Sequence, residues 1–410
     1  MSGLLKPADA EQAREAVAWA VAEETPVEIR GRGSKTGLGR PQQTDYQIDL
    51  SDLSGISLYE SDELVMSAGP GTPVAEIEAA LAAHNQELAF EPPDYGPLYG
   101  IAAGSGSMGG VIACNLAGPR RIKAGAARDH FLGVHGISGR GEAFKSGGRV
   151  VKNVTGYDLC KLMTGSYGTL AAMTDLTFKV LPAPEKTRTV LAFALSDETA
   201  IALLCAAAGS PHEVSGLAHL PAPVAARSGV SYVAGAGASV TAIRVEGPGP
   251  SVEYRCEALK RMAADKGVVE ELHSHNSVAL WREVRDVNAF AADAVGAARP
   301  LWRLSVTPTN GAEAAGKVLD HAEGEAVFDW SGGLIWLSLA EADDAHAELV
   351  RGAAAAAGGH ATLIRAADAV RASVPVFQPQ PAALAGLSAR VKDSFDPRRI
   401  LNPGRMYAGV

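Results

Sequence analysis

The sequence predicts an α+β protein in two parts that meet near residue 184. The first part joins short strands through glycine-rich turns, whereas the second alternates apolar strands with alanine-rich helices, and Pro182 and Pro184 lie between them. Strands that alternate with helices in this way are typical of a sheet covered by helices, here expected to be antiparallel. With 410 residues, of which 47% are hydrophobic and 20% charged, the chain is long enough for one large or two smaller globular domains.

Charge and cysteine content exclude several classes of function. The net charge of −9 disfavours nucleic acid as a partner, because nucleic-acid-binding domains are usually basic. The four cysteines show no CxxC spacing, so no zinc or iron–sulfur ligation and no metal site are expected. Sparse cysteines and the lack of an apolar leader predict a cytoplasmic protein. No apolar run of about 18 residues occurs, which predicts no direct membrane insertion.

The first part of the chain begins with a helix and continues through short strands. Helical periodicity covers residues 8–24, and "TPVEIR" predicts a strand that leads into a glycine-rich loop. Further strands are expected at 46–50, 56–59 and 64–68, followed by a helix over 73–84 with Thr72 as its N-cap. Alternating strands and turns are expected from residue 131, then a short helix, a glycine turn and a strand that ends near Pro182.

The second part alternates between predicted strands and helices. Strands are expected at 189–195, 240–247, 300–308, 332–340 and 360–366, and helices at 197–208, 252–266, 311–322 and 341–357. Trp302, Trp330 and Trp336 are placed on these strands, where tryptophan is most often a core or interface residue. The "HSHN" segment at 273–276 is interpreted as a solvated polar turn.

The loop "RGRGSKTGLGR" at residues 30–40 is the first candidate for chemistry. Glycines let backbone amides turn toward one point and form an anion-binding concavity, and Arg30, Arg32, Lys35 and Arg40 add positive charge. The loop contains neither GxxxxGK[ST] nor a GxGxxG spacing that opens a helix. A surface hairpin with solvated basic residues explains the same pattern, and both interpretations stay open.

Two more glycine-rich segments follow in the same part of the chain. Residues 104–118 are interpreted as a loop to which a flat or extended ligand comes close, with Asn115 as the side chain that both donates and accepts hydrogen bonds. "GSYG" at 165–168 again offers backbone amides and a hydroxyl. Three such segments within one domain favour a long ligand with several recognition points, and a dinucleotide meets that description.

These motifs, in this order, resemble a known family. "RGRGSKTGLG", "GSMGGVIACNLAGPRR", "VVKNVTGYDLCKLMTGSYGTL" and the terminal "FDPRRILNPGRMY" are similar to the PCMH-type FAD-binding domain of the vanillyl-alcohol-oxidase family. More narrowly, "AGPRRIKAGAARDHFLGV" and "FDWSGGLIWL" resemble the smaller FAD-binding subunit of glycolate oxidase (glycolate dehydrogenase). The resemblance implies an FAD-binding domain of two α/β subdomains over 1–183, an α+β cap domain over 184–390 and a C-terminal return over 391–410.

The resemblance also implies a set of FAD-binding residues. The first loop contributes the pyrophosphate contacts, the second loop and "GSYG" contribute further flavin contacts, and the terminal "LNPGR" reaches toward the isoalloxazine. The residues at the matching positions are Arg32, Gly33, Ser34, Lys35, Thr36, Gly39, Gly109, Gly110, Asn115, Gly118, Gly165, Ser166, Gly168, Asn402 and Arg405. Ser34 stands where relatives with covalent flavin carry histidine, which implies non-covalent FAD.

Departures from the family concern the substrate machinery. The catalytic relatives carry a His-x-Gly-x-Gly-Asn-x-His metal run that this sequence lacks, and Tyr167 stands where they usually carry glutamate. Catalytic residues are therefore left unassigned. The resemblance implies a subunit that carries flavin electrons beside a larger catalytic flavin subunit and an iron–sulfur subunit, peripheral at the inner membrane through these partners. A free-standing FAD-dependent 2-hydroxy-acid dehydrogenase and a structural subunit with a vestigial flavin site remain alternatives.

Overall fold

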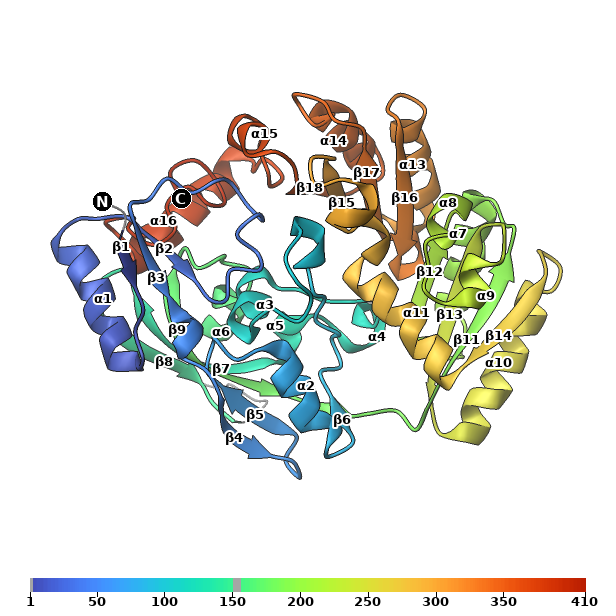
Figure 1. Ribbon diagram of the computed structural model, residues 1–410, viewed down its shortest axis with the longest axis horizontal. Coiled ribbons are helices and arrows are strands. Elements are labelled where there is room, and N and C mark those ends of the chain that lie inside the picture. The colour runs from blue at the N-terminus through green and yellow to red at the C-terminus, as the bar shows by residue number, and fades with distance from the viewer. Residues whose placement is uncertain (1–2, 150–155) are drawn as a thin grey trace.

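The computed structural model describes residues 3–149 and 156–410 and shows two lobes joined by a short extended segment (Figure 1). Residues 150–155, which belong to the "VVKNVTGYDLC" motif, lie outside the described residues. Mixed helix and sheet run through both lobes, and the α+β class predicted from the sequence is confirmed. The boundary at residue 184 stays a prediction, although it falls between the last strand of one lobe and the first strand of the other.

The first lobe carries two main sheets and one short two-stranded sheet. The elements are β1 Gly3–Leu5, α1 Ala10–Ala22, β2 Val27–Arg30, β3 Tyr46–Asp49, β4 Ile56–Glu60, β5 Val65–Ala68, α2 Val74–Ala82, β6 Gln86–Glu87, α3 Met108–Cys114, α4 Arg121–Ala124, α5 Ala127–His130, β7 Phe131–Ser138, β8 Ala143–Gly147, α6 Leu159–Met163, β9 Ala171–Lys179 and β10 Leu181–Pro182. Three parallel strands in the order β1-β3-β2 form the smaller sheet, and five antiparallel strands in the order β4-β5-β9-β7-β8 form the larger one.

Local sequence explains why the first helix forms where it does. Asp9 caps α1, because its carboxylate accepts a hydrogen bond of 2.8 Å from the amide of Gln12. Ala13, Val17 and Ala20 recur at intervals of three and four residues and are buried on one face of the helix. The adjoining strand β2 therefore enters the lobe in a fixed position and carries the chain into the glycine-rich loop.

The second lobe is one antiparallel sheet with helices against it. Its elements are β11 Lys186–Phe193, α7 Asp197–Ala208, β12 Gly216–Leu220, α8 Ala222–Ala225, α9 Ser231–Ala234, β13 Val240–Gly247, α10 Gly249–Ala263, β14 Val269–His273, α11 Ser274–Asp286, α12 Ala292–Val295, β15 Leu301–Ser305, α13 Gly311–Leu319, β16 Gly324–Asp329, β17 Leu334–Leu339, α14 Ala347–Ala356, β18 His360–Arg365 and α15 Asp368–Ser373. The eight strands run in the order β14-β11-β13-β12-β16-β17-β15-β18. Apolar residues of α7, α10, α13 and α14 form one core with this sheet, and α11 contributes to the core that continues into the first lobe.

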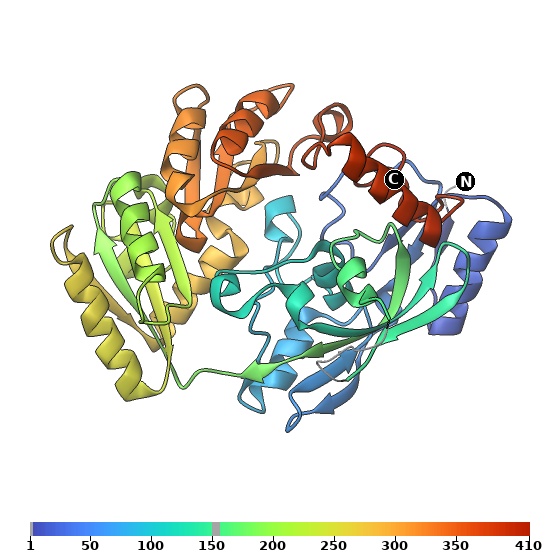
Figure 2. The ribbon, with the colours of Figure 1, turned by 180° about the vertical axis from the view of Figure 1, so that it is seen from behind.

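The C-terminal segment returns to the first lobe. Helix α16, Ala382–Phe395, lies beside the N-terminal strands in both views (Figures 1 and 2). Lys392 and Asp396 are fully buried and form an ion pair of 2.8 Å, while the Lys392 ammonium also donates to the carbonyls of Thr169 and Leu401. Leu401 in turn bridges to Val27 of β2. This buried pair therefore connects the end of the chain to the strand that leads into the glycine-rich loop.

Several local predictions are wrong. Thr72 does not cap α2: Pro73 takes the N-cap position, and the Thr72 hydroxyl donates instead to the carbonyl of Gly69. Residues 108–114 of the second glycine-rich segment form helix α3 and are not a loop, because Val111 and Ile112 are buried in the core. The "HSHN" segment begins α11 and is not a turn.

The structure also departs from the prediction at three strands and a tryptophan of the second lobe and at several helices. Strands β12, β14 and β16 were not predicted, since they are short and carry charged or small residues that weaken the apolar pattern. Helices α11 and α16 were missed although they are long, because polar and small residues interrupt their apolar pattern. The short helices α8, α9, α12 and α15 were also not predicted. Trp330 lies in a tight turn after β16, not on a strand, and the backbone φ values of Trp330, Ser331 and Gly332 are 50°, 62° and 91°. Two non-glycine residues in the left-handed region store strain, which packing around the indole must offset.

The buried carboxyl before this turn should make the stability of the protein depend on pH. Burial raises the pKa of Asp329 to about 7, although its Oδ1 accepts a hydrogen bond of 2.7 Å from the amide of Trp330. An unfolded aspartic acid titrates near 4, so the stabilisation present below that pH is lost as pH rises toward 7. We expect Asp329→Asn to become more stable than the wild type as pH rises from 4 to 7, by roughly 3–4 kcal/mol at pH 8.

Denaturant unfolding at pH 4, 5, 6, 7 and 8 measures this difference. The matched control is Asp62→Asn, because Asp62 is exposed in the turn after β4. The control should follow the wild type at every pH. A difference between Asp329→Asn and the wild type that does not change with pH would contradict the assignment.

Candidate functional site

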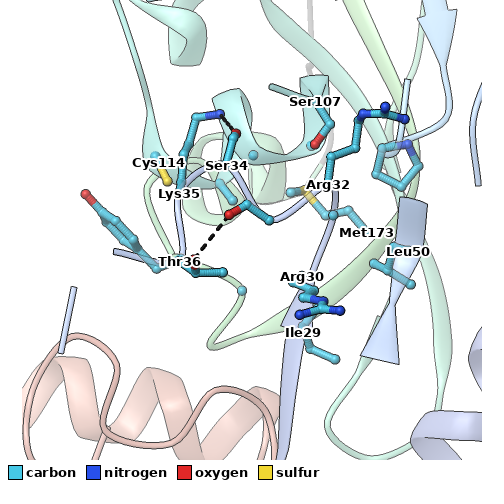
Figure 3. A pocket seen from close by; sticks show the side chains of 18 of the residues that line it. Ile29, Arg30, Arg32, Ser34, Lys35, Thr36, Leu50, Ser107, Cys114 and Met173 are labelled. Carbon is cyan, nitrogen blue, oxygen red and sulfur yellow. Dashed lines mark hydrogen bonds between the residues drawn. The ribbon is translucent and has the colours of Figure 1, made fainter. Parts of the chain in front are cut away.

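A cavity of about 90 Å³ opens where the glycine-rich loop meets α3, the turn before β9 and the C-terminal segment (Figure 3). Nine of the residues predicted as site residues line it: Arg32, Gly33, Ser34, Lys35, Thr36, Gly109, Gly110, Gly168 and Arg405. They come from four separate segments of the chain, so the fold brings together positions that are far apart in the sequence.

The loop after β2 presents its backbone to this cavity. Gly33 has a φ of 78°, a left-handed conformation that favours glycine, and a Cβ on Gly31 would displace the Ser107 hydroxyl, which lies 2.7 Å from that position. In the described part of the chain, no hydrogen bond engages the amides from Gly31 to Lys35. Consecutive amides without an internal acceptor form the kind of concavity that binds anions.

Lys35 places a buried ammonium group at the wall of the cavity. The residue is 7% exposed, and its Nζ donates to Ser34 Oγ at 3.2 Å, as the dashed line in Figure 3 shows. Among the described residues no carboxylate lies within 4 Å of this ammonium, and burial lowers the pKa of Lys35. A buried charge without a counter-ion is costly, so this position calls for an anionic ligand.

Helix α3 forms the facing wall with two glycines. A Cβ on Gly109 would lie 2.7 Å from Pro70 Cβ, which shows that the helix packs closely on the turn before α2. Gly110 is different, because the nearest atoms to its Cβ would be Lys35 Nζ at 3.4 Å and Ser107 Oγ at 3.6 Å, which are ordinary contact distances. The open space above Gly110 therefore faces the same ammonium group.

Arg405 fixes the loop from the C-terminal side. Its guanidinium donates to the carbonyls of Lys35 and Leu38 at 3.1 and 3.0 Å, and its Nη1 lies 3.6 Å from Glu28 Oε1. Arg30 lies 3.5 Å from Asp49. The basic residues of the cavity thus divide into two that pair with carboxylates and two, Arg32 and Lys35, for which the described residues provide no ion pair.

The other six predicted site residues do not line this cavity. They are Gly39, Asn115, Gly118, Gly165, Ser166 and Asn402. Asn402 is 1% exposed and donates to the carbonyl of Tyr167 at 2.7 Å while accepting from the amide of Ile29 at 2.7 Å, so it joins β2 to the turn before β9. The Ser166 hydroxyl donates to the carbonyl of Met163. The carbonyls of Gly39 and Gly118 accept from Arg371 and Trp330, respectively.

Sequence reasoning left out other residues of the cavity. Arg30 was expected to add positive charge to the loop, and the residues that were not proposed at all are Glu28, Ile29, Gly31, Leu50, Pro70, Ser107, Ala113, Cys114, Tyr167, Ala171 and Met173. Gly31 and Ser107 lie inside the glycine-rich segments, and this position in the sequence could have indicated that they line the cavity. Leu50, Pro70 and Met173 are ordinary core residues in the sequence, and only the tertiary structure places them at the cavity.

A second cleft, of about 300 Å³, adjoins the first and lies between the lobes. Both are lined by Cys114 and Tyr167, so they are neighbours along one continuous wall. Asn115 and Gly165, two of the predicted site residues, line this second cleft. Burial raises the pKa of the Tyr167 phenol well above its ordinary value, and its ring packs edge-on against Phe377 at 4.9 Å. Tyr167 is therefore a neutral aromatic wall between the two spaces.

Across 3–149 and 156–410, no three His, Cys, Asp or Glu side chains gather in a way that could hold a metal ion. Within the same ranges, no helix has the length and apolarity needed to cross a bilayer.

This chain resembles known proteins both in sequence and in three-dimensional structure. The FAD binding domain family matches residues 1–147. The glycolate oxidase subunit GlcE of Escherichia coli is 36% identical over 406 residues, which cover 99% of both chains. A D-lactate dehydrogenase of Archaeoglobus fulgidus is 33% identical over 181 residues, covering 44% of this chain and 38% of that protein. Among solved structures, p-cresol methylhydroxylase superposes with a TM-score of 0.75 at 14% identity, covering 99% of this chain and 88% of that one.

The first of these relatives covers both lobes, whereas the dehydrogenase covers less than half of the chain. Identity above 30% over the full length identifies the protein family, and the structural likeness at 14% identity supports the fold alone. The predicted PCMH-type fold class is thereby confirmed.

Proposed function

Since this chain belongs to the family of FAD-linked oxidoreductases that includes the glycolate oxidase subunit GlcE, we propose that it is the FAD-binding subunit of a glycolate oxidase. In that role it supports the oxidation of glycolate, or of another short 2-hydroxy acid, to the 2-oxo acid. The bound flavin supplies the chemistry of accepting a hydride, and the protein supplies binding, orientation and electrostatics.

The buried ammonium of Lys35 is the observation that carries this proposal. It faces a cradle of free amides and two glycines, and an FAD pyrophosphate provides the negative charge that the described residues do not. Arg32, Gly33, Ser34, Lys35 and Thr36 would hold the pyrophosphate with Gly109 and Gly110 opposite. Gly168 and Arg405 would complete this wall.

The six predicted site residues that do not line the first cavity are also consistent with FAD binding. Asn115 and Gly165 would border the flavin in the second cleft, while Gly39, Gly118, Ser166 and Asn402 would hold the loops in place through the hydrogen bonds of their own groups. Ser34, in the position where a histidine would attach flavin covalently, supports non-covalent FAD. We also propose a division into an FAD-binding domain over 1–183, a cap domain over 184–390 and a return segment over 391–410.

The partners are part of the proposal. The name of the E. coli relative describes a subunit, which supports a heteromeric complex. We propose a larger catalytic flavin subunit and an iron–sulfur subunit as partners, in a cytoplasmic complex that is peripheral at the inner membrane through them.

A second candidate function is a free-standing FAD-dependent 2-hydroxy-acid dehydrogenase. The D-lactate dehydrogenase relative and the cleft between the lobes favour it. Anaerobic addition of glycolate to the purified flavin-loaded chain, alone and with its co-expressed partner subunits, distinguishes the two. We expect the flavin absorbance near 450 nm to persist in the chain alone and to bleach in the complex. Bleaching of the chain alone would contradict the subunit proposal and support the free-standing enzyme.

A further inference from the structure

The cleft between the lobes has a wall built from one face of the sheet. Arg303 and Ser305 alternate along β15, and the register pairs them with Thr362 and His360 of β18. Residues two apart on a strand and their cross-strand partners share a face. All four line the cleft. Arg303 is the one permanently charged side chain among them, and Ser305, Thr362 and His360 lie beside it.

The facing wall comes from the first lobe and adds a second cation. Arg121, at the start of α4, lines the cleft with Tyr95 and Tyr167. In the described part of the chain, neither Arg121 nor Arg303 donates a side-chain hydrogen bond or forms an ion pair. The proximity of Arg303 contributes to the lowered pKa of both Arg121 and His360, although burial is the larger cause for each. Positive charge therefore accumulates here without a counter-ion.

Trp330 holds the two guanidinium groups in this arrangement. The guanidinium carbons of Arg121 and Arg303 lie 4.7 and 5.2 Å from the centre of the Trp330 ring. The indole Nε1 donates to the carbonyl of Gly118 at 3.1 Å, which fixes the ring from the first lobe. The turn at Trp330 is strained, and it places the indole ring close to two arginines that form no ion pair among the described residues. Backbone strain of this kind is often found at binding sites.

Two acids act on this charge, Asp129 on Arg121 and Asp329 on Arg303, and among the described residues neither forms an ion pair with an arginine of the cleft. Asp329 lies close enough to Arg303 to feel its charge, yet it forms no ion pair with it and does not line the cleft. Its carboxylate accepts from the amide of Trp330 instead. The lining contains no Asp or Glu side chain at all within the described residues.

From these observations we infer that the cleft between the lobes is a binding site for a small carboxylate that carries an oxygen on the neighbouring carbon, held by Arg303 and Arg121. A guanidinium pairs with a carboxylate through two parallel hydrogen bonds. The Ser305 and Thr362 hydroxyls stand beside Arg303 on the same face and are suited to the second oxygen. The inference rests on the proposed function for its choice of ligand, because a short 2-hydroxy acid has this chemistry. It places binding of the acid in this chain, whereas oxidation of the acid still requires the complex.

Isothermal titration calorimetry of the purified flavin-containing chain with oxalate tests the inference at fixed ionic strength. Oxalate has the carboxylate and the neighbouring oxygen and is not oxidised by flavin. We expect saturable binding that Arg303→Met and Arg121→Met each weaken by about tenfold to a hundredfold. Arg261→Met, on the exposed surface of α10, is the matched control and should bind as the wild type does.

Three outcomes would overturn the inference. They are wild-type affinity in both cleft variants, binding of inorganic phosphate as tight as that of oxalate, and no oxalate binding by chain that contains flavin. The flavin absorbance of each preparation is recorded separately. A colourless chain that still binds oxalate through Arg303 would contradict the proposed function and leave the carboxylate site standing.

Discussion

Replacing Gly110 by leucine is expected to remove FAD from the protein while leaving the fold intact. The Cβ of residue 110 meets only ordinary contacts, at 3.4 Å from Lys35 Nζ and 3.6 Å from Ser107 Oγ, so the backbone of α3 need not move. The rest of the leucine side chain would occupy the space that faces the Lys35 ammonium. Overfilling such a site costs about 1–3 kcal/mol, which weakens FAD binding by roughly fivefold to more than a hundredfold.

Flavin absorbance per chain after gel filtration measures this effect, with thermal unfolding as the test of the fold. Gly352→Leu is the control, because a Cβ at Gly352 on α14 meets no atom within 4 Å. Normal flavin content in Gly110→Leu would contradict the proposed cradle. Loss of flavin from Gly110→Leu with full activity of the assembled complex would instead support a structural subunit with a vestigial site.

Replacing Lys392 by methionine is expected to cause the largest loss of stability. The side chains of Lys392 and Asp396 are both 0% exposed, and the ammonium donates to two carbonyls as well as to the carboxylate. Removal of one partner leaves the Asp396 charge buried without compensation, which costs about 3–5 kcal/mol. Because Asp396 also accepts from the amides of Ile400 and Leu401, the C-terminal return should loosen together with the loop that Arg405 holds.

Denaturant unfolding and flavin retention on dilution measure the two consequences. The exposed pair of Lys317 and Glu313 on α13 provides the control, since Lys317→Met should change stability by no more than about 0.5 kcal/mol. A change of similar size in Lys392→Met would show that the buried pair does not anchor the return segment.

Much of the fold could be predicted from the sequence, because in many segments the local sequence pattern agrees with the tertiary structure. Helix α7 was predicted at its observed bounds, since a serine cap precedes an uninterrupted apolar pattern. Helix α3 could not be predicted, because two of its seven residues are glycine and its stability comes from the burial of Val111 and Ile112. Tertiary packing here outweighs local propensity.

The candidate site also has one part that the sequence indicates and one part that only the tertiary structure reveals. The loop from Arg32 to Thr36 is continuous in the sequence, and its glycines and charges indicated an anion site, with a solvated surface hairpin as the alternative. The cleft between the lobes combines Arg121 of the first lobe with Arg303 and His360 of the second, which lie far from it in the sequence. Their meeting depends on the register of β15 with β18 and on the turn at Trp330, and neither has a local signal in the sequence.

The visible absorption spectrum of the purified wild-type chain, before and after denaturation and ultrafiltration, tests the central claim most directly. The account predicts a flavin spectrum of the native chain at close to one FAD per chain, with all of the flavin passing the filter after denaturation because Ser34 offers no covalent attachment. A colourless chain that takes up no added FAD, or flavin that stays with the denatured polypeptide, would contradict it.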